Sequence, residues 1–405
     1  MDIKNIKKEF PIFKQKINGK PLIYLDSANS SQKPKVVIDR ISHFYETEFS
    51  NVGRSVHALA VKATNSFETT RDKVQKYLNA NHREEIIFTK GATEAINLVA
   101  SSYGKKYINK GDEILITELE HHSNYVPWNF LRTEKGAVIK FAQVNENGDI
   151  ELDEIKKLIT SKTKIIAITH ISNVTGAVLP ITKIVDLAKE KKIPVLIDGT
   201  QGAPHSEIDM QKIGCDFYAI SCHKMYGPNG LGLLYMKKKW VDDLPPYQGG
   251  GGMINEVKKD EISFADAHTK FEAGTMQTAE VVAFAESLNF IDKLGIKNIA
   301  SHENEILQYG LEILKKNNSI NIIGDPKERG SVLCFTLKDI HPHDIATILD
   351  DDGVAIRAGH HCCQILHDKL GIPATARASI GVYNDKEDID KLSDAIKNCQ
   401  KVFQN

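Results

Sequence analysis

A lysine and an aspartate each follow a short apolar run, where a buried strand is expected to end. Asp198 comes directly after 195–197, and Lys224 comes shortly after 217–220. An amine placed this way can bond to an aldehyde, and a carboxylate can keep a pyridine nitrogen protonated. A pyridoxal phosphate site needs both groups. On these two residues alone, an ordinary Lys–Asp pair at two strand ends is an equally good interpretation.

Polar groups nearby could bind a phosphate. Gly91-Ala92-Thr93 lies between an expected strand and an expected helix, where free N–H groups and the helix dipole attract an anion. Thr93 adds a hydroxyl, and Ser221 and His223 can add donors from a second strand end. Thr93 could instead only cap the helix.

Two histidines, His121 and His122, follow another expected strand. A flat imidazole there can stack on a pyridine ring. Metal ligation and a solvated loop are the alternatives. Metal is disfavoured because no carboxylate or cysteine stands nearby at metal-ligand spacing.

A second reactive segment is Arg357-Ala358-Gly359-His360-His361-Cys362-Cys363. A thiol beside two imidazoles and an arginine is placed for a lowered pKa, which produces thiolate. The segment could also be a metal site that includes His367, which is disfavoured because adjacent residues rarely face one ion, or a surface loop with incidental cysteines. Further on, Arg377 could hold a carboxylate through a bidentate fork or form a structural ion pair.

Strands and helices alternate from about residue 85 to 240. Strands are expected at 85–89, 113–117, 137–141, 164–170, 195–197 and 217–220, and helices at 91–102 and from Pro180 to about Lys192. Continuous apolar strands joined by helices predict a parallel sheet buried on both faces. Ligands of such sheets bind beyond the carboxyl ends of the strands, where the polar residues above fall.

The rest of the chain predicts a smaller α+β domain. After four glycines at 249–252 comes an irregular polar stretch to about residue 274, then helical periodicity to about 317. Strand-like 332–336 and 354–356 and a terminal helix follow. Residues 1–10 read as an amphipathic helix.

The composition is that of a soluble globular protein. The chain has 405 residues, 41% hydrophobic and 26% charged, with a formal net charge of -1, so neither nucleic acid nor membrane is expected as a partner. No signal peptide or membrane-spanning run is found. The six cysteines form no CxxC pair, and Cys215, Cys334 and Cys399 lie in apolar contexts typical of packing. A cytoplasmic location is expected.

Six motifs then occur together in one order. They are EHHSNYVPW at 120–128, THISNVTG at 169–176, DGTQ at 198–201, HKMYGPNGLG at 223–232, FEAGT at 271–275 and RAGHHC at 357–362. With them the chain resembles the SufS-type (group II) cysteine desulfurases, a branch of the fold-type I pyridoxal phosphate enzymes. The resemblance runs from Tyr24 to Ser379 and implies a mainly parallel seven-stranded sheet in a large domain at 20–290. A small domain would comprise 1–19 and 291–405.

The resemblance also implies roles for individual residues. Lys224 would bind the cofactor covalently and move the α-proton, and Cys362 would be the nucleophile that takes sulfur from L-cysteine as a persulfide. Further cofactor contacts would come from Thr93, His121, Asp198, Gln201, Ser221 and His223, and from Thr275 of the second subunit of a homodimer. His121 could also assist proton transfer. Asn173 and Arg377 would hold the substrate carboxylate, and Arg357 would help order the nucleophile loop. An acceptor protein of the SufE or SufU type would collect the sulfur for iron–sulfur cluster assembly.

The chain departs from the usual pattern of this family at Gly53, Ala92, Lys270, Met276-Gln277 and Cys363. Cys363 stands where alanine is usual, so a second thiol adjoins the nucleophile and could be inert or act as a relay. Two other functions stay open. One is a selenocysteine lyase of the same fold, and the other is a non-catalytic sulfur-relay or metal-binding subunit.

Overall fold

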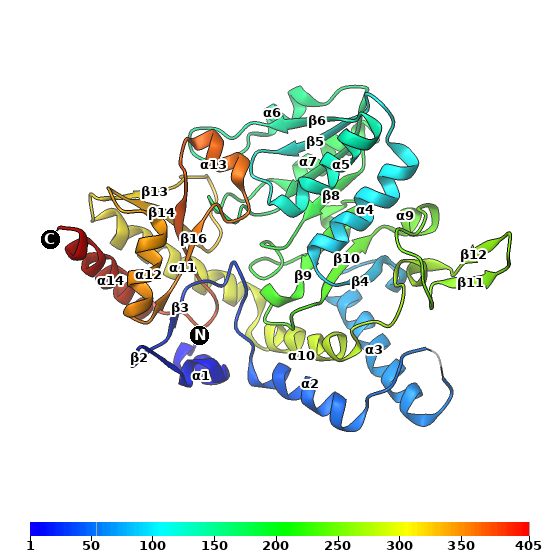
Figure 1. The fold of residues 1–405 in the computed structure, drawn as a ribbon, viewed down its shortest axis with the longest axis horizontal. Coiled ribbons are helices and arrows are strands. Elements are labelled where there is room, and N and C mark those ends of the chain that lie inside the picture. Colours follow the sequence, from blue (N-terminus) through cyan, green and yellow to red (C-terminus); the bar gives the residue numbers. More distant parts are fainter. Residues whose placement is uncertain (54, 405) are drawn as a thin grey trace.

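A seven-stranded sheet forms the centre of the larger unit in the computed structural model, which describes residues 1–53 and 55–404 (Figure 1). The strand order is β4 (Ile86–Thr89), β10 (Gly232–Met236), β9 (Phe217–Ser221), β8 (Val195–Asp198), β7 (Thr163–Thr169), β5 (Glu113–Thr117) and β6 (Val138–Ala142). Strand β10 is antiparallel to its neighbours β4 and β9, and the other neighbouring pairs are parallel. The prediction of a mainly parallel seven-stranded sheet is confirmed.

Both faces of this sheet are buried except along the edge strand β6, as the continuous apolar strands predict. Successive residues of one strand enter opposite cores: Ile166 and Ile168 lie in one cluster, and Ile165 and Ala167 lie in the other. Helices α3 (Ala58–Tyr77), α6 (Leu152–Leu158), α7 (Ile181–Glu190) and α10 (Thr278–Leu294) supply side chains to the first cluster. Helices α4 (Ala92–Tyr107), α5 (Val126–Lys135) and α9 (Lys238–Asp243) supply the second.

A four-stranded antiparallel sheet forms the smaller unit. Its order is β13 (Ile320–Ile322), β14 (Val332–Leu337), β17 (Thr375–Ser379) and β16 (Arg357–Gly359). Helices α11 (Ile296–Lys315), α12 (Pro342–Asp351) and α14 (Lys386–Gln404) pack on it through a third apolar cluster. Near the N-terminus, β3 (Ile23–Tyr24) pairs in parallel with β15 (Val354–Ala355). The α+β character is as predicted, while the domain ranges 20–290 and 1–19 with 291–405 stay predictions.

The remaining short elements surround these two sheets. They are α1 (Ile3–Lys8), α2 (Lys35–Thr47), α8 (Met210–Ile213), α13 (Gln364–Leu370), β1 (Lys16–Ile17), β2 (Lys20–Pro21), β11 (Ile254–Val257) and β12 (Ile262–Phe264). None of the helices in the described ranges is both long and apolar enough to cross a membrane.

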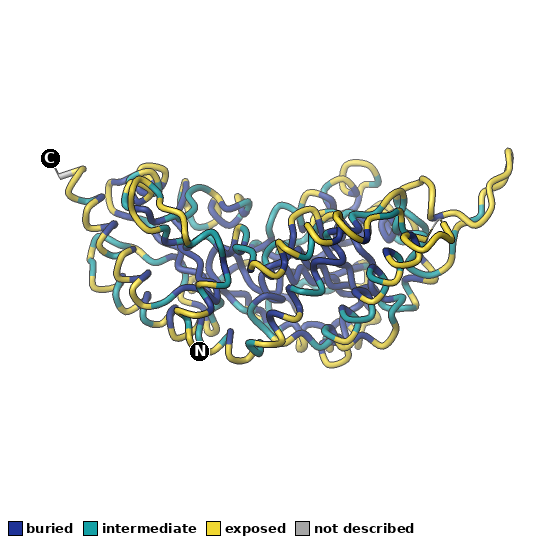
Figure 2. The backbone as a smooth tube through the Cα atoms, turned by 90° about the horizontal axis from the view of Figure 1, so that it is seen from below, coloured by how far each residue is buried: buried dark blue, intermediate teal, exposed yellow. Residues whose placement is uncertain are grey.

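The expectation of an irregular stretch between 249 and 274 is wrong. Strands β11 and β12 form an antiparallel hairpin there that projects from the molecule as an exposed arm (Figure 2). All four side chains of β11 are exposed, so no buried face gives this strand a recognisable sequence pattern.

The helical stretch expected up to about residue 317 consists of two helices. Gly295, with a backbone φ of 81°, separates them.

A buried ion pair ties the FEAGT segment to the large sheet. The Arg71 side chain on α3 has no exposed surface, and its two terminal nitrogens lie 2.8 and 2.9 Å from the two carboxylate oxygens of Glu272. Glu272 also accepts a hydrogen bond from the backbone N–H of Phe88 in β4 at 2.8 Å. Three separate segments therefore meet at one carboxylate.

Removing this carboxylate is expected to destabilise the protein. Glu272→Ala leaves the Arg71 guanidinium buried, with only Glu68 as an acidic partner, at a cost of about 3 kcal/mol. We expect unfolding at clearly lower urea than for the wild type. Glu312→Ala is the matched control, because it removes the same group from an exposed helical pair with Lys316 and should leave the midpoint unchanged. Equal midpoints for the two variants would contradict the structural role of the pair.

Candidate active site

A cavity of about 210 Å³ lies at the carboxyl ends of β7, β8 and β9, where the sequence predicts ligand binding. Its lining includes all the predicted site residues except Thr275 and Arg377: Thr93, His121, Asn173, Asp198, Gln201, Ser221, His223, Lys224, Arg357 and Cys362. A larger, more open hollow of about 890 Å³ shares Thr93, Ser221 and His223 with it. We place the chemistry in the smaller cavity, because Lys224, Asp198 and Cys362 line only that one.

The lysine is held in a form suited to bonding with an aldehyde. Lys224 follows β9 in a short turn, and burial, with a contribution from the Arg377 charge, lowers the pKa of its amine to about 8 even though Asp198 opposes the shift. A substantial fraction of the amine is therefore neutral and nucleophilic near neutral pH.

This pKa gives an expected pH dependence for cofactor uptake. Only the deprotonated amine reacts with an aldehyde, so binding of pyridoxal phosphate to the cofactor-free protein should accelerate as pH rises, with a midpoint near 8. Binding at pH 6 should be about fiftyfold slower than at pH 8, which stopped-flow absorbance can measure. A midpoint near the ordinary lysine value would show that Lys224 is not desolvated as described.

Asp198 is a buried carboxyl group that forms no direct ion pair in the described part of the chain, although the nearby Lys224 charge favours its ionised form. It ends β8, burial raises its pKa, and the Thr200 N–H donates to it at 3.0 Å. A protonated ring nitrogen would supply the missing positive charge.

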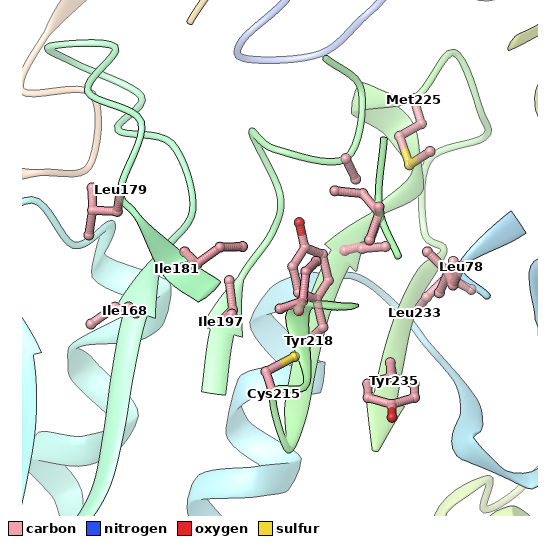
Figure 3. Packing of buried hydrophobic residues seen from close by; sticks show 14 of the residues in the cluster. Leu78, Ile168, Leu179, Ile181, Ile197, Cys215, Tyr218, Met225, Leu233 and Tyr235 are labelled. Atoms are coloured by element: carbon pink, nitrogen blue, oxygen red, sulfur yellow. The ribbon is translucent and has the colours of Figure 1, made fainter. Parts of the chain in front are cut away.

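Two glycines let the loop after Asp198 pass close to the sheet. A Cβ at Gly199 would collide with the ring of Tyr218, and one at Gly202 would collide with the ring of His170. Tyr218 lies on β9 and packs in the core next to the strand that carries Ile197 (Figure 3). Its hydroxyl is hydrogen-bonded to His170 Nδ1 at 2.8 Å. The DGTQ motif therefore needs glycine at position 199 for steric reasons.

Helix α4 begins at the edge of the cavity, and hydroxyl groups surround its start. The backbone N–H of Ala92 donates to Ser221 Oγ at 2.9 Å, and Thr93 Oγ1 lies 2.7 Å from Ser123 Oγ. Burial and the Lys224 charge lower the pKa of His223 to about 4, so this imidazole is neutral at neutral pH and can still donate a hydrogen bond. Helix N–H groups, hydroxyls and a neutral imidazole together suit a phosphate.

His121 faces the same cavity. Burial and the Lys224 charge lower the pKa of this imidazole to about 3, and its Nδ1 accepts a hydrogen bond from the Ser123 N–H at 3.1 Å. A neutral ring beside the lysine can stack on a flat cofactor.

The nucleophile loop is tightly turned. His361 and Cys362 both have left-handed backbone conformations, with φ of 51° and 58°, and the Cys362 carbonyl accepts a hydrogen bond from the His122 N–H at 2.7 Å. One terminal nitrogen of Arg357 lies 3.5 Å from Cys362 Sγ, and the other donates to Asn29 at 3.1 Å. A positive charge is thus fixed beside the sulfur.

The expectation that the His361 imidazole favours thiolate at Cys362 needs correction. His361 is buried with its Nε2 2.9 Å from Thr375 Oγ1, and burial together with the Arg377 and Arg357 charges lowers its pKa to about 2. It is neutral at neutral pH and adds no positive charge to the loop. The charge beside Cys362 comes from Arg357 instead.

Two predicted residues lie outside the cavity lining. Arg377 is fully buried behind it, and its terminal nitrogens donate to the Asn173 carbonyl at 3.0 Å and to Asp26 at 3.2 Å, while its Nε has no partner. The structural ion pair considered for Arg377 is therefore present, and direct substrate contact stays a proposal. Thr275 is exposed on the surface, as a residue that serves a neighbouring subunit would be.

Sequence reasoning did not single out several residues that line the cavity. They are Asn29, Ser123, Thr169, Ile171 and Thr200. Ser123, Thr169, Ile171 and Thr200 fall inside quoted motifs, so proximity to the motif residues was the available signal. In the described part of the chain, no group of three or more His, Cys, Asp or Glu side chains is arranged to hold a metal ion.

The fold and this constellation define a class of protein. A buried lysine, an acid at a neighbouring strand end and a phosphate cradle at a helix start, on a mainly parallel seven-stranded sheet, are the features of a fold-type I pyridoxal phosphate enzyme. The aminotransferase class-V family model matches residues 23–392, and the chain belongs to this family.

Several known proteins of similar sequence or structure are named as cysteine desulfurases or probable cysteine desulfurases. A probable cysteine desulfurase of Halalkalibacterium halodurans is 43% identical over 403 residues, covering 100% of this chain and 99% of the relative. One of Staphylococcus epidermidis is 46% identical, covering 99% and 98%. The crystal structure of the cysteine desulfurase CsdA from Escherichia coli superposes with a TM-score of 0.92 at 34% identity, covering 99% of each chain. The apo cysteine desulfurase of Thermococcus onnurineus NA1 has a TM-score of 0.93 at 32% identity, covering 98% of each.

Enzymes of this family depend on pyridoxal phosphate, and the residues of the cavity fit that cofactor. The unpaired Asp198 carboxyl group matches the ring nitrogen, the partly neutral Lys224 amine matches the aldehyde, and the start of α4 matches the phosphate. The Gln201 side chain, which donates to the Ala28 carbonyl at 2.7 Å, lies on the same loop as Asp198 and lines the same cavity.

Proposed function

We propose that this chain is a cysteine desulfurase that converts L-cysteine to L-alanine and keeps the sulfur as a persulfide on Cys362. The observation that carries the proposal is the position of the Cys362 thiol, which shares one cavity with Lys224 and Asp198 and has the Arg357 guanidinium 3.5 Å from its sulfur.

Pyridoxal phosphate, when bound, supplies an electron sink that weakens the bonds next to the substrate amine. Asp198 would keep a proton on the ring nitrogen of the cofactor, and His121 would stack on the ring. Lys224 would hold the cofactor covalently, and its amine, when free, would take the α-proton of the substrate. Asn173 and Arg377 orient the substrate carboxylate. These roles are part of the proposal.

Cys362 then performs the sulfur transfer. Its sulfur attacks the substrate sulfur, so that an S–S bond forms and the bond between Cβ and sulfur breaks. The electron pair of the broken bond stays with the carbon, which takes up a proton. In sum, the enzyme thiol and cysteine become enzyme persulfide and alanine, and no external oxidant is needed. An acceptor thiol can remove the outer sulfur by exchange.

Partners and location belong to the same proposal. The exposed Thr275 and the open hollow beside the phosphate cradle support a homodimer in which a second subunit completes the site. The persulfide would pass to an acceptor protein of the SufE or SufU type. A cytoplasmic location is proposed because the reaction needs Cys362 as a free thiol, which a reducing compartment maintains.

The test is product formation by the protein loaded with pyridoxal phosphate. With L-cysteine and a thiol reductant, we expect alanine and sulfide in equal amounts, measured by amino-acid analysis and a sulfide assay. A protein that shows the absorbance of bound pyridoxal phosphate but forms no alanine would contradict the proposal.

A further inference from the structure

Cys363, which stands where the family usually has alanine, contacts a residue of the substrate site. Its side chain is fully buried, and its Sγ lies 2.9 Å from Asn173 Oδ1, with the Leu119 carbonyl 4.0 Å away. The thiol is a hydrogen-bond donor here, because a side-chain amide oxygen can only accept.

The same amide holds the residue on the other side of the nucleophile. Asn173 Nδ2 donates to the His361 carbonyl at 2.7 Å, so the side chain of Asn173 bridges the residues that flank Cys362. The backbone carbonyl of Asn173 is in turn fixed by Arg377 at 3.0 Å. Asn173 is therefore anchored at its backbone and bonded to the nucleophile loop at both ends of its amide.

We propose that Cys363 is a positioning residue that locks the amide of Asn173 and so restrains the Cys362 loop. The proposal deepens the proposed function and rests on it for the role of Cys362. With alanine at 363, Asn173 Oδ1 would lose this donor, and the amide could turn away from the His361 carbonyl. With cysteine, only one amide orientation satisfies both bonds, and that orientation keeps Nδ2 toward the loop.

The local backbone explains why this loop needs restraint. His361 and Cys362, two consecutive non-glycine residues with left-handed backbones, lie inside a turn that the Cys363 N–H closes on the His360 carbonyl at 2.9 Å. Such conformations persist only where the surroundings hold them. The Asn173 bridge provides contacts of this kind on both sides of the sulfur that must reach the substrate.

The environment of Cys363 argues against a sulfur relay. Burial and the nearby Glu120 raise the pKa of its thiol, so thiolate is scarce, and the side chain has no exposed surface for an acceptor to reach. A neutral, buried thiol is suited to donating a hydrogen bond rather than to attacking a persulfide.

The experiment compares Cys363→Ala and Cys363→Ser with the wild type, all loaded with pyridoxal phosphate. The first readout is the rate at which iodoacetamide alkylates Cys362 without substrate, located by peptide mass spectrometry. Losing one hydrogen bond should make alkylation of Cys363→Ala about two- to tenfold faster. Cys363→Ser keeps a hydrogen-bond donor, so alkylation of Cys362 in this variant should stay close to the wild-type rate. Cys399→Ala, which removes a buried thiol from the far helix α14, is the matched control and should leave the rate unchanged.

The second readout separates substrate binding from chemistry. Because Asn173 lines the cavity, Cys363→Ala should raise KM for L-cysteine by a similar factor and change kcat less. Equal alkylation rates in Cys363→Ala and the wild type would overturn the proposal. An alkylation rate of Cys363→Ser as fast as that of Cys363→Ala would also overturn it. Sulfur found on Cys363 during turnover would also overturn it, in favour of a relay. Alkylation requires no turnover, so this result stands apart from success or failure of the desulfurase assay.

Discussion

Cys362→Ala is expected to form alanine from L-cysteine more than about a thousandfold more slowly than the wild type, because the atom that accepts the sulfur is gone. The variant should still bind pyridoxal phosphate, since the sulfur lies on a separate loop from Lys224 and from the start of α4. The measurement is alanine produced per subunit, with cofactor content determined from absorbance in the same samples.

The control for this loss is Cys399→Ala, which removes a buried thiol that packs in the small unit and does not reach the cavity. It should form alanine at the wild-type rate. If Cys362→Ala keeps a large part of the activity while Cys399→Ala is normal, Cys362 is not the sulfur acceptor.

Lys224→Ala is expected to lose activity by about a hundred- to ten-thousandfold, the usual contribution of a positioned acid–base group. The variant should also hold the cofactor without a covalent bond, so that reduction with borohydride no longer attaches pyridoxal phosphate to the peptide that contains residue 224. Mass spectrometry after borohydride treatment checks the second expectation independently of turnover.

A small amine can separate the chemical role of Lys224 from a structural one. Methylamine should restore part of the activity of Lys224→Ala, because the deleted side chain leaves space in the cavity and the added amine can move the proton. Lys316→Ala, at the exposed C-terminal cap of α11, should behave as the wild type. Full activity of Lys224→Ala without added amine would contradict the proposed site.

Topology explains why so much of the site can be predicted from sequence. Asp198 and Lys224 each follow an apolar run, and parallel neighbouring strands bring the carboxyl ends of such runs to one edge. Thr93 follows β4, which β10 separates from β9, yet it reaches the same cavity because β4 runs parallel to β9. The pattern of strands and following loops therefore contains most of the geometry.

The orientations of two site side chains, Arg377 and His361, could not be predicted from sequence, because they depend on contacts between distant segments. Arg377 pairs with Asp26, a residue 351 positions away, and lies behind the cavity lining rather than in it. His361 adjoins the nucleophile in sequence but faces Thr375 in space. Neither orientation has a local signal, because each is set by which buried partner the fold brings within reach.

The hairpin of β11 and β12 was missed for another reason. A strand is recognised by the alternation of buried and exposed side chains, and almost every side chain of this hairpin is exposed. Its sequence therefore resembles that of a polar loop.

The most direct test of the central claim is mass spectrometry of the peptide that contains Cys362, after the loaded protein reacts with limiting L-cysteine in the absence of reductant. We predict that this peptide gains the mass of one sulfur atom, that fragmentation places the sulfur on Cys362, and that alanine appears in matching amount. Alanine formed while Cys362 remains unmodified, or with the sulfur on another cysteine, would contradict the account.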